Sequence, residues 1–296
     1  MPSPTVTEFE THRPYLTAVA HRMLGNRAEA EDAVQEAWLR YARQPAAAIR
    51  DARGWLTTVT GRICLDQLNS ARVRRTAYPG EWLPAFVVEP DAGPADRAEI
   101  ADQVGLALLV VLERLTPEQR VAFVLHDAFG VPFDEVAAVL DSTPAAARQH
   151  ASRARRAVSG AGVRHTAGPA EQRRVLDAFL AAAQDGDMRR LAAILAPDVV
   201  AVSDGGGVVR AALRPIHGVE KVTRFFTGLV ANRFADVSDL TMEPVLVEGS
   251  AAVLIRGDWA DGGRLAVVLG VAVDNGLITG LFSQQNPEKL VLGDLE

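Results

Sequence analysis

The sequence is short of the residues that build disulfide-bonded, metal-binding and membrane-spanning proteins. Its single cysteine, Cys64, excludes an intramolecular disulfide bond, and the spacing of cysteine and histidine fits no zinc site. No stretch approaches the roughly 18 apolar residues of a membrane helix, and the N-terminus lacks a charged segment followed by an apolar one. We therefore expect a cytoplasmic protein that does not bind a membrane and has no metal site and no cofactor.

Lysine is almost missing as well, and acidic residues outnumber basic ones. Lys221 and Lys289 are the only lysines among 31 basic residues, so nearly all of the positive charge is carried by arginine. The net charge of −6 argues against a chain that coats nucleic acid through bulk charge. The arginines nevertheless gather in two basic clusters, one made of Arg62, Arg72, Arg74 and Arg75 and the other of Arg148, Arg153, Arg155 and Arg156.

The length and the apolar content favour several domains. A chain of 296 residues with 48% hydrophobic side chains can bury more than one core. Apolar residues recur at helical spacing in 9–24, 28–43 and 55–68, which predicts a compact helical bundle over residues 1–76. Four prolines and two glycines in the next segment predict an extended connector over 77–95.

Residues 96–160 predict a second helical domain. Thr116 precedes a proline and stands three residues before a glutamine, which is the pattern of a capped helix start. A short amphipathic helix over 132–140, a polar turn and a second helix over 144–158 follow it. This order predicts a helix-turn-helix.

After a linker over 161–169, the pattern changes within residues 170–296. Two helices come first, and Asp187 is suited to cap the second. The pairs Glu248-Gly249 and Asn275-Gly276 predict hairpin turns. We therefore expect an α+β domain with an antiparallel sheet. Its strands are expected at 199–202, 244–247, 251–256, 265–273 and 277–283.

The second helix of the helix-turn-helix carries side chains suited to contact DNA bases. Arginine pairs with guanine and glutamine pairs with adenine in the major groove. The residues expected to do so share one helical face, and they are Arg148, Gln149, Ser152 and Arg153. The alternative is a solvated helix face, but the helix has no acidic residue between 144 and 158.

The first basic cluster lies near aromatic and polar residues. Trp55 precedes Arg62 by seven residues, so both lie on one side of a helix. The polar loop just before them, with Arg50, Asp51 and Arg53, would complete a pocket for an unstacked base. For Trp55 itself, the simpler interpretation is a core position.

Three segments of the first 160 residues resemble those of a known family, the bacterial extracytoplasmic-function sigma factors. The segments are 30–40 (AEDAVQEAWLR), 54–56 (GWL) and 115–120 (LTPEQR), in the order and spacing of the family. The resemblance implies two all-α sigma domains. It also implies that the first binds RNA polymerase and the −10 promoter element, and that the second binds the −35 element.

Carried over by position, the resemblance implies specific contacts. The residues that would face core RNA polymerase are Asp32, Gln35 and Glu36. Those that would face the −10 element are Arg50, Asp51, Arg53, Arg62 and Asp66. The four residues of the helix-turn-helix named above would face the −35 element. The negative net charge is no obstacle, since a subunit that reaches promoter DNA as part of polymerase need not bind duplex DNA strongly alone.

The last third is similar to the SnoaL-like, nuclear-transport-factor-like domains, and sigma factors with this extension form a recognisable group. Three signatures of that group match here, at Trp82-Leu83-Pro84, at Asp204-Gly205-Gly206-Gly207 and at Asn286-Pro287-Glu288-Lys289-Leu290. Ala85 and Val208 follow the first two where the group has Glu and Lys. The resemblance implies a cone-shaped domain that packs on the sigma domains, tunes them and replaces a separate anti-sigma protein.

Two other functions fit parts of the sequence. A ligand-responsive helix-turn-helix regulator would bind duplex DNA without polymerase. A cyclase or isomerase in the last domain would use Asp204 or His217 as acid or base, although Asp204 begins a glycine triplet typical of a turn. We expect no enzyme, and we retain a small molecule bound in the last domain as an open alternative.

Overall fold

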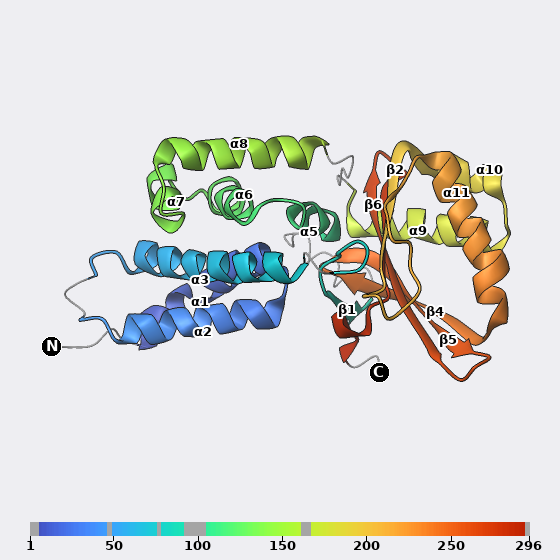
Figure 1. Cartoon of the computed structure of the whole chain (residues 1–296), viewed down its shortest axis with the longest axis horizontal. Helices are drawn as coiled ribbons and strands as arrows, with labels where there is room; N and C mark the ends of the chain where they lie inside the picture. The colour runs from blue at the N-terminus through green and yellow to red at the C-terminus, as the bar shows by residue number, and fades with distance from the viewer. Residues whose placement is uncertain (1–5, 46–48, 76–77, 92–104, 161–166, 294–296) are drawn as a thin grey trace. The chain divides into compact units, whose positions relative to one another are not determined.

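The computed structural model describes residues 6–45, 49–75, 78–91, 105–160 and 167–293 (Figure 1). The chain forms two compact units, and each is described by itself. Unit 1 comprises Met1–Ala77 and Arg114–Val158, and unit 2 comprises Tyr78–Glu113 and Ser159–Glu296. Within the described ranges, no helix has the length and apolar character needed to span a membrane. The same ranges contain no group of three or more His, Cys, Asp or Glu side chains arranged to hold a metal ion.

Unit 1 begins with the three predicted helices. They are α1 (Val6–Leu24), α2 (Arg27–Ala42) and α3 (Ala52–Arg75). The first ends because Gly25 adopts a φ of 71° in the left-handed region. Asn26 caps α2, since its side chain accepts a hydrogen bond from the backbone of the first turn. The apolar stripes of α1 and α2 are buried, which confirms their helical spacing.

The second part of unit 1 contains the predicted helix-turn-helix. Its elements are α6 (Pro117–Phe123), the π-helical turn η2 (Val124–Ala128), α7 (Phe133–Val139) and α8 (Pro144–Gly160). The capping box at Thr116 is confirmed. The Thr116 side chain accepts a hydrogen bond from the backbone N–H of Gln119, and the Gln119 side chain accepts one from the backbone N–H of Thr116. The π-helical turn was not predicted, since no residue pattern used above distinguishes it from an α-helix.

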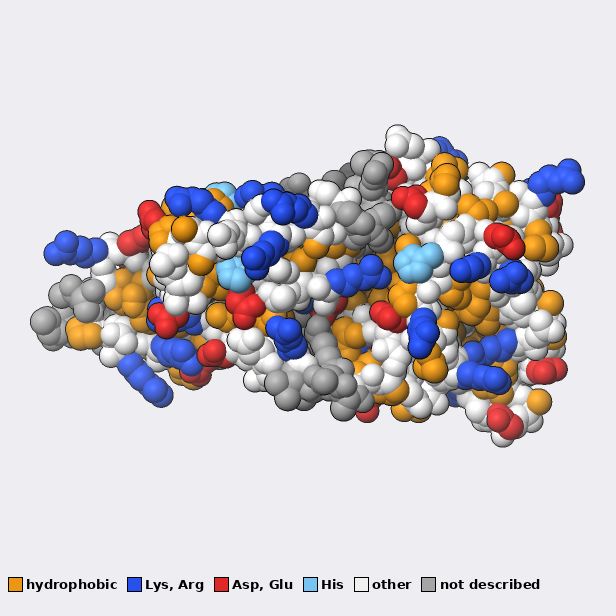
Figure 2. Space-filling model, turned by 45° about the horizontal axis from the view of Figure 1, so that its top comes forward, with side chains coloured by type: hydrophobic (Ala, Val, Ile, Leu, Met, Phe, Trp, Pro, Cys, Tyr) orange, Lys and Arg blue, Asp and Glu red, His pale blue; other side chains and the backbone are white. Residues whose placement is uncertain are grey.

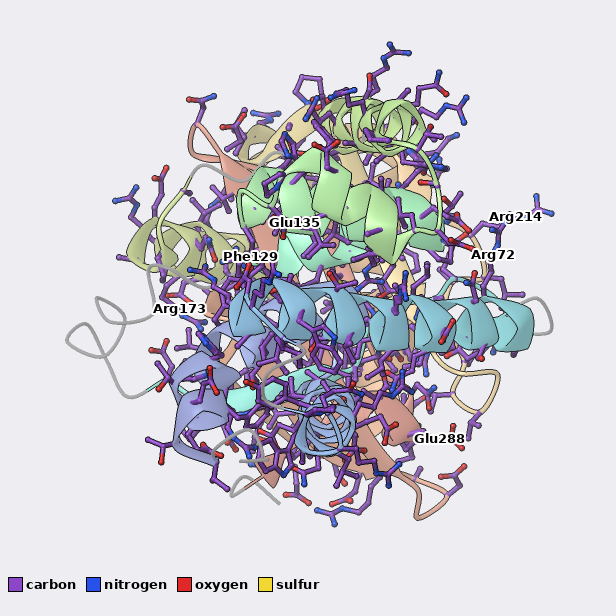
Figure 3. The ribbon with its side chains drawn as sticks, turned by 90° about the vertical axis from the view of Figure 1, so that its left-hand side faces the viewer. Arg72, Phe129, Glu135, Arg173, Arg214 and Glu288 are labelled. Atoms are coloured by element: carbon purple, nitrogen blue, oxygen red, sulfur yellow. The ribbon has the colours of Figure 1, made fainter. Side chains whose placement is uncertain are left out.

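The two groups of helices in unit 1 pack against each other. Helix α3 lies against α6 and α7, and α1 lies against η2. Gly61 permits this approach, because a Cβ there would lie only 2.9 Å from a methyl group of Val139. The rings of Tyr15 and Phe129, the latter labelled in Figure 3, meet edge to face at 5.5 Å.

Unit 2 is built on an eight-stranded sheet in the order β3-β2-β7-β6-β5-β4-β1-β8. Its strands are β1 (Phe86–Pro90), β2 (Leu195–Asp204), β3 (Ile216–His217), β4 (Val237–Val247), β5 (Ser250–Trp259), β6 (Arg264–Asp274), β7 (Leu277–Gln284) and β8 (Leu290–Val291). Both predicted hairpin turns are confirmed: Glu248 and Asn275 have φ of 50° and 51°, and a left-handed glycine follows each.

The prediction of a wholly antiparallel sheet is wrong. Strand β2 pairs with β7 in parallel, and β1 pairs with β8 in parallel. The reason is the connection after β2, which crosses over before the chain enters the meander from β4 to β7. The last strand of that meander returns beside β2 in the same direction, so the sheet is mixed.

Helices pack on one face of this sheet (Figure 1). They are α9 (Pro169–Gln184), α10 (Met188–Ile194), α11 (Val219–Gly228), the π-helical turn η3 (Leu229–Arg233) and the short 3-10 helix η4 (Phe234–Asp236). A further short 3-10 helix, η5 (Pro287–Lys289), follows β7. Asp187 caps α10, as predicted, by accepting hydrogen bonds from two backbone N–H groups at 3.0 Å. Helix α11 was missed by the sequence patterns. The core of the unit lies between these helices and the sheet.

The predicted connector is part of unit 2. Its residues in β1 pair with both β4 and β8. Helix α5 (Leu106–Leu112) belongs to the same unit and packs on β6, where a Cβ at Gly270 would lie 2.3 Å from the Leu106 side chain. The Leu106 backbone N–H also donates to the Ser250 hydroxyl at 3.1 Å. Residues 92–104 and 161–166 lie outside the described residues, and with them the predicted helix start at 96 and most of the linker.

Candidate functional site

The residues expected to face polymerase lie on the outer side of α2. Asp32 and Gln35 are exposed, and Glu36 is half-buried. The Glu36 carboxylate accepts a hydrogen bond from Arg40 Nε, one turn away, at 2.9 Å. The structure brings the three residues to one exposed side because the opposite stripe, which includes Ala33, is buried.

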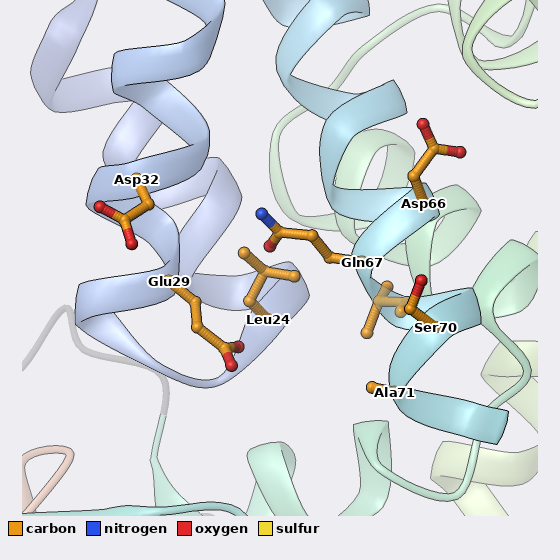
Figure 4. A pocket seen from close by; sticks show the side chains of 8 residues that line it. Leu24, Glu29, Asp32, Asp66, Gln67, Ser70 and Ala71 are labelled. Atoms are coloured by element: carbon orange, nitrogen blue, oxygen red, sulfur yellow. The ribbon is translucent and has the colours of Figure 1, made fainter. Parts of the chain in front are cut away.

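Asp32 also lines a groove between α2 and α3 (Figure 4). Glu29 joins it from α2, and Asp66 and Gln67 line it from α3. Three acidic residues from two helices therefore line one acidic groove, although the Asp66 carboxylate points away from the other two in Figure 4. The groove suits a basic partner surface. Within the described residues, Gln67 Oε1 is buried without a hydrogen-bond partner. Sequence reasoning missed Glu29 and Gln67, because the spacing along one helix does not show which residues face its neighbour.

The loop and first turn of α3 carry three of the predicted −10 residues. Arg50, Asp51 and Arg53 are all exposed. Asp51 caps the helix, since its Oδ1 accepts a hydrogen bond from the Gly54 backbone N–H at 3.1 Å. The Arg53 guanidinium lies 4.2 Å from the centre of the Tyr15 ring. The structure thus leaves these charged groups accessible while it gives two of them a structural contact.

Arg62 is engaged elsewhere in unit 1. Its Nε and Nη2 donate to the backbone carbonyl of Ala138 at 3.2 and 2.7 Å. That carbonyl lies in the last turn of α7, where unpaired C=O groups attract a cation. The predicted −10 residues are therefore divided, since Asp66 lines the acidic groove and Arg62 contacts the helix-turn-helix. The side chains of Arg74 and Arg75 lie outside the described residues.

The predicted −35 residues share the exposed face of α8. Arg148, Gln149 and Arg153 are exposed, and Ser152 is half-buried. This helix carries arginines and no lysine, and basic side chains gather in this part of the space-filling view (Figure 2). One arginine of the cluster is paired, because Arg155 Nε lies 2.6 Å from a carboxylate oxygen in η2. The remaining face has the chemistry for base and phosphate contacts.

In unit 2, the three sequence signatures come together around one carboxylate. We define this connector cluster as Tyr78, Trp82, Leu83, Asp204, Asn286 and Lys289. The Oδ2 of the fully buried Asp204 accepts hydrogen bonds from Lys289 Nζ at 2.7 Å and from the Leu83 backbone at 2.9 Å. Its Oδ1 accepts from the Tyr78 hydroxyl and, at 3.0 Å, from the Gly206 backbone. The carboxylate is thus fully satisfied inside the unit.

Aromatic rings from the connector cover the ammonium group of Lys289. The Nζ atom lies 3.1 Å from the centre of the Trp82 ring and 4.3 Å from that of Tyr78. It also donates to the Leu83 carbonyl at 3.0 Å. Burial, together with the hydrogen bond to Asp204, raises the pKa of the Tyr78 hydroxyl. Tyr78 therefore keeps its proton and remains a donor. No sequence motif marks Tyr78.

The glycine triplet is explained by close approach. Gly206 has a φ of 64°, and a Cβ there would lie 2.5 Å from Asn286 Cγ. Gly207 has a φ of 74°, and its Cβ would lie 2.5 Å from Pro79 Cγ. A Cβ at Gly205 would meet a backbone oxygen at 2.1 Å. A larger residue would therefore displace the C-terminal segment at Gly206, the connector at Gly207, and the backbone of Val209 at Gly205.

The other signature residues hold the ends of the cluster. The Pro84 carbonyl accepts a hydrogen bond from Gln284 Nε2 at 2.9 Å. Asn286 caps η5, because its side chain accepts from the Glu288 backbone at 3.0 Å and Pro287 stands at the first helical position. The structure therefore brings residues of all three signatures together inside unit 2, and their interdomain regulatory role stays a prediction.

Unit 2 contains a cavity between its helices and the sheet, and the acid-base candidates of the enzyme alternative do not line it. Asp204 is taken up by the connector cluster, and His217 is exposed on β3. Among the described residues that line the cavity, none is Asp, Glu or His.

Comparisons with known proteins divide the chain into three parts. Residues 9–74 match the family model of sigma-70 region 2, residues 105–158 match sigma-70 region 4, and residues 176–280 match the SnoaL-like domain. Regions 2 and 4 followed by a SnoaL-like domain define a sigma factor with a C-terminal extension. The chain belongs to the extracytoplasmic-function (ECF) RNA polymerase sigma factor family.

Full-length relatives and a solved structure support this membership. "ECF RNA polymerase sigma factor SigJ" of Mycobacterium tuberculosis is 42% identical over 290 residues, which cover 96% of this chain and 92% of the relative. "Probable ECF RNA polymerase sigma factor SigI" of the same species is 36% identical, with 97% and 95% covered. The crystal structure of Mycobacterium tuberculosis SigJ matches with a TM-score of 0.74 and 39% identity, covering 96% of this chain and 98% of that one. The predicted fold class and family are confirmed.

Proposed function

We propose that this sigma factor brings core RNA polymerase to promoters through α2, α3 and α8, and that its own C-terminal domain tunes this activity. The observation that carries the second part is the position of α5. This helix begins the segment matched by region 4, yet it packs on β6 of the C-terminal domain.

The acidic groove supports the polymerase contact. Asp32 and Asp66 line it from two helices, and Gln35 and Glu36 extend the polar surface along α2. A basic surface on core polymerase would match this charge, and complementary charge speeds association and fixes orientation. The groove also supplies Gln67, whose unpaired oxygen would accept a hydrogen bond from the partner.

Two surfaces of unit 1 support the promoter contacts. The exposed face of α8 would enter the major groove of the −35 element, where each good bidentate pair adds about 1 to 3 kcal/mol of discrimination. The start of α3, with Arg50 and Arg53, would take a base of the melted −10 strand, whose extrusion costs a few kcal/mol. Arg62 would join that second surface after it leaves Ala138.

The C-terminal domain would act on the sigma regions through the chain itself. Only residues 113–116 separate α5 in unit 2 from α6 in unit 1. A change in how the sheet holds α5 and β1 is therefore passed to region 4 through a very short link. Because this regulator is part of the same chain, the proposal needs no separate anti-sigma protein. Acting with polymerase, the protein would work in the cytoplasm.

Run-off transcription tests the first part of the proposal. The purified chain with core RNA polymerase should initiate at specific sites on genomic fragments, and core polymerase alone should not. The same chain without polymerase should leave those fragments unshifted in a gel. A specific shift without polymerase, together with no specific initiation, would instead favour a helix-turn-helix regulator that binds duplex DNA by itself.

Tuning is better tested by substitution than by truncation. A chain cut after the predicted linker would lose the sheet on which α5 and β1 pack. Lys289→Met removes the ammonium group at the centre of the connector cluster, while Lys221→Met changes the only other lysine, which is exposed. We expect Lys289→Met alone to change transcript yield. Faster protease cleavage of the connector in Lys289→Met than in Lys221→Met would show that the cluster has loosened. If both variants then gave equal transcript yields, tuning by this domain would be contradicted.

A further inference from the structure

A narrow cavity lies between α9, the segment from α11 to η3, and the sheet. Its walls are almost wholly apolar, with Phe179 from α9, Phe226 from α11, Val230 from η3 and Leu269 from β6. The rings of Phe179 and Phe226 meet edge to face at 5.1 Å. Protein cores are normally close-packed, so an apolar space of this kind suits an apolar guest.

Arg233 lies where this cavity adjoins a broader cleft, since it lines both. The residue ends η3, and π-helical turns are frequent at functional sites. Its guanidinium lies 5.4 Å from the centre of the Trp259 ring and donates one hydrogen bond to the backbone carbonyl of Arg210. A guanidinium carries five N–H donors, so this contact uses only part of its capacity.

Within the described part of the chain, no carboxylate forms an ion pair with Arg233 or with Arg210 beside it. Partial burial and the nearby charge of Arg210 lower the pKa of Arg233. Asp236 and Asp261 line the outer cleft but not the cavity, and Asp261 accepts a hydrogen bond from a backbone N–H. An anion held between the cavity and the cleft would compensate the guanidinium.

We propose that this site binds a slim amphipathic carboxylate, such as a medium-chain fatty acid. The alkyl chain lies among the phenylalanine rings of the cavity, and the carboxylate lies on the guanidinium of Arg233. Arginine holds carboxylates through two parallel N–H bonds, and the guanidinium of Arg233 also lies over the Trp259 ring. The narrow bore favours an unbranched chain over a fused ring system.

Gln285 links this site to the connector cluster. It lines both the cavity and the cleft, and its backbone N–H donates to the Asp204 carbonyl at 2.8 Å. The next residue is Asn286, a member of the cluster. A ligand that shifts Gln285 would therefore shift the cluster as well. This regulatory consequence rests on the proposed function, whereas binding itself does not.

Calorimetric titration of the full chain tests the binding site. Octanoate should bind saturably and about tenfold more tightly than octan-1-ol, a difference of about 1.4 kcal/mol that the carboxylate supplies. Arg233→Gln should remove this preference and leave octanol binding unchanged. Arg224→Gln on α11 is the matched control, because Arg224 is exposed and lines neither the cavity nor the cleft, and it should behave as the wild type.

A second variant guards against a trivial loss of fold. Val230→Trp places a ring in the cavity from the half-buried side of η3 and should abolish binding of both ligands without lowering the melting temperature of the domain. Equal affinities for octanoate and octanol, or an octanoate preference that survives in Arg233→Gln, would overturn the proposal. If octanoate binds as expected but leaves transcript yield unchanged, only the regulatory consequence fails. If no specific transcript forms with or without octanoate, the proposed sigma function fails and the binding result stands.

Discussion

Lys289 Nζ lies 2.7 Å from Oδ2 of Asp204, although the two residues are 85 positions apart in the sequence. Asp204 has no exposed surface, and Lys289 retains 8% exposure. The pair fastens the C-terminal segment to the end of β2, and the connector closes over it with Trp82 and Leu83. One buried ion pair therefore joins three parts of the chain.

Removing one member of this pair should destabilise unit 2. Lys289→Met leaves the Asp204 carboxylate buried without its cation, which costs about 3 to 5 kcal/mol. Urea unfolding should show this loss, whereas Lys221→Met should stay within about 0.5 kcal/mol of the wild type because that lysine is exposed. Equal stability of the two variants would contradict the assigned role of the pair.

The glycine triplet gives a second prediction with a matched control. Gly206 and Gly262 both have positive φ, at 64° and 86°, so alanine strains the backbone at either position. Only at Gly206 would the added Cβ collide, since it would lie 2.5 Å from Asn286, while nothing stands within 4 Å of Gly262. The melting temperature should therefore fall further for Gly206→Ala than for Gly262→Ala. Similar melting temperatures would mean that Asn286 yields without cost.

Cys64 should report the packing of unit 1. Burial raises the pKa of its thiol to about 12, so the reactive thiolate is almost absent at pH 8. We expect a thiol reagent to label the native protein only as fast as the helices open. The thiol of an unfolded chain has a pKa of about 8.5. Below that pH, the free energy of unfolding therefore contains the full contribution from keeping the buried thiol neutral. It should fall by about 1.4 kcal/mol per pH unit as the pH rises toward 12. Fast labelling at pH 8 in the absence of denaturant would contradict this prediction.

Arg62 should show two separable effects. Arg62→Ala removes the hydrogen bonds from α3 to the Ala138 carbonyl. Val139→Ala instead removes about 1.5 kcal/mol of apolar packing of α7 on Gly61. Both variants should speed the labelling of Cys64. Only Arg62→Ala should also slow promoter melting, measured with a fluorescent base in the −10 strand. If melting slows equally in both, Arg62 acts through packing alone.

The face of α8 predicts sequence-dependent effects. Arg153→Ala should lower transcription from a native −35 element but not from a scrambled one, because it removes a base contact of about 1 to 3 kcal/mol. Arg156→Ala, further along the helix, should lower both equally, as expected for a phosphate contact. Equal effects of Arg153→Ala on both templates would place that arginine on the phosphate backbone instead.

Local patterns predicted most of the helices and turns correctly. The N-cap at Asp187, the capping box at Thr116 and the turn at Asn275 each depend on residues within one or two turns of the chain. Helix α11 and the parallel pairing of β2 with β7 escaped prediction. Their formation depends on a surface that exists only after the sheet has folded.

The site was predictable in its residue types and not in its partnerships. The signatures pointed to Asp204 and Lys289 without showing that they pair, and nothing in the sequence marked Tyr78 or Gln67. The charge pattern of α2 was visible, but the groove that joins Asp32 to Asp66 was not. Each of these results needs two segments to meet, and periodicity describes one segment at a time.

The sequence by itself determined two helical domains followed by an α+β extension, because helix spacing, caps and hairpin turns are local properties of the backbone. Only the tertiary structure decided which arginines are engaged and which are exposed, and that the connector and α5 belong to the C-terminal sheet. The physical reason is that burial and hydrogen bonding are settled between distant segments. Arg62 therefore donates hydrogen bonds to the Ala138 carbonyl, whereas Arg153, with the same side chain, is exposed to solvent.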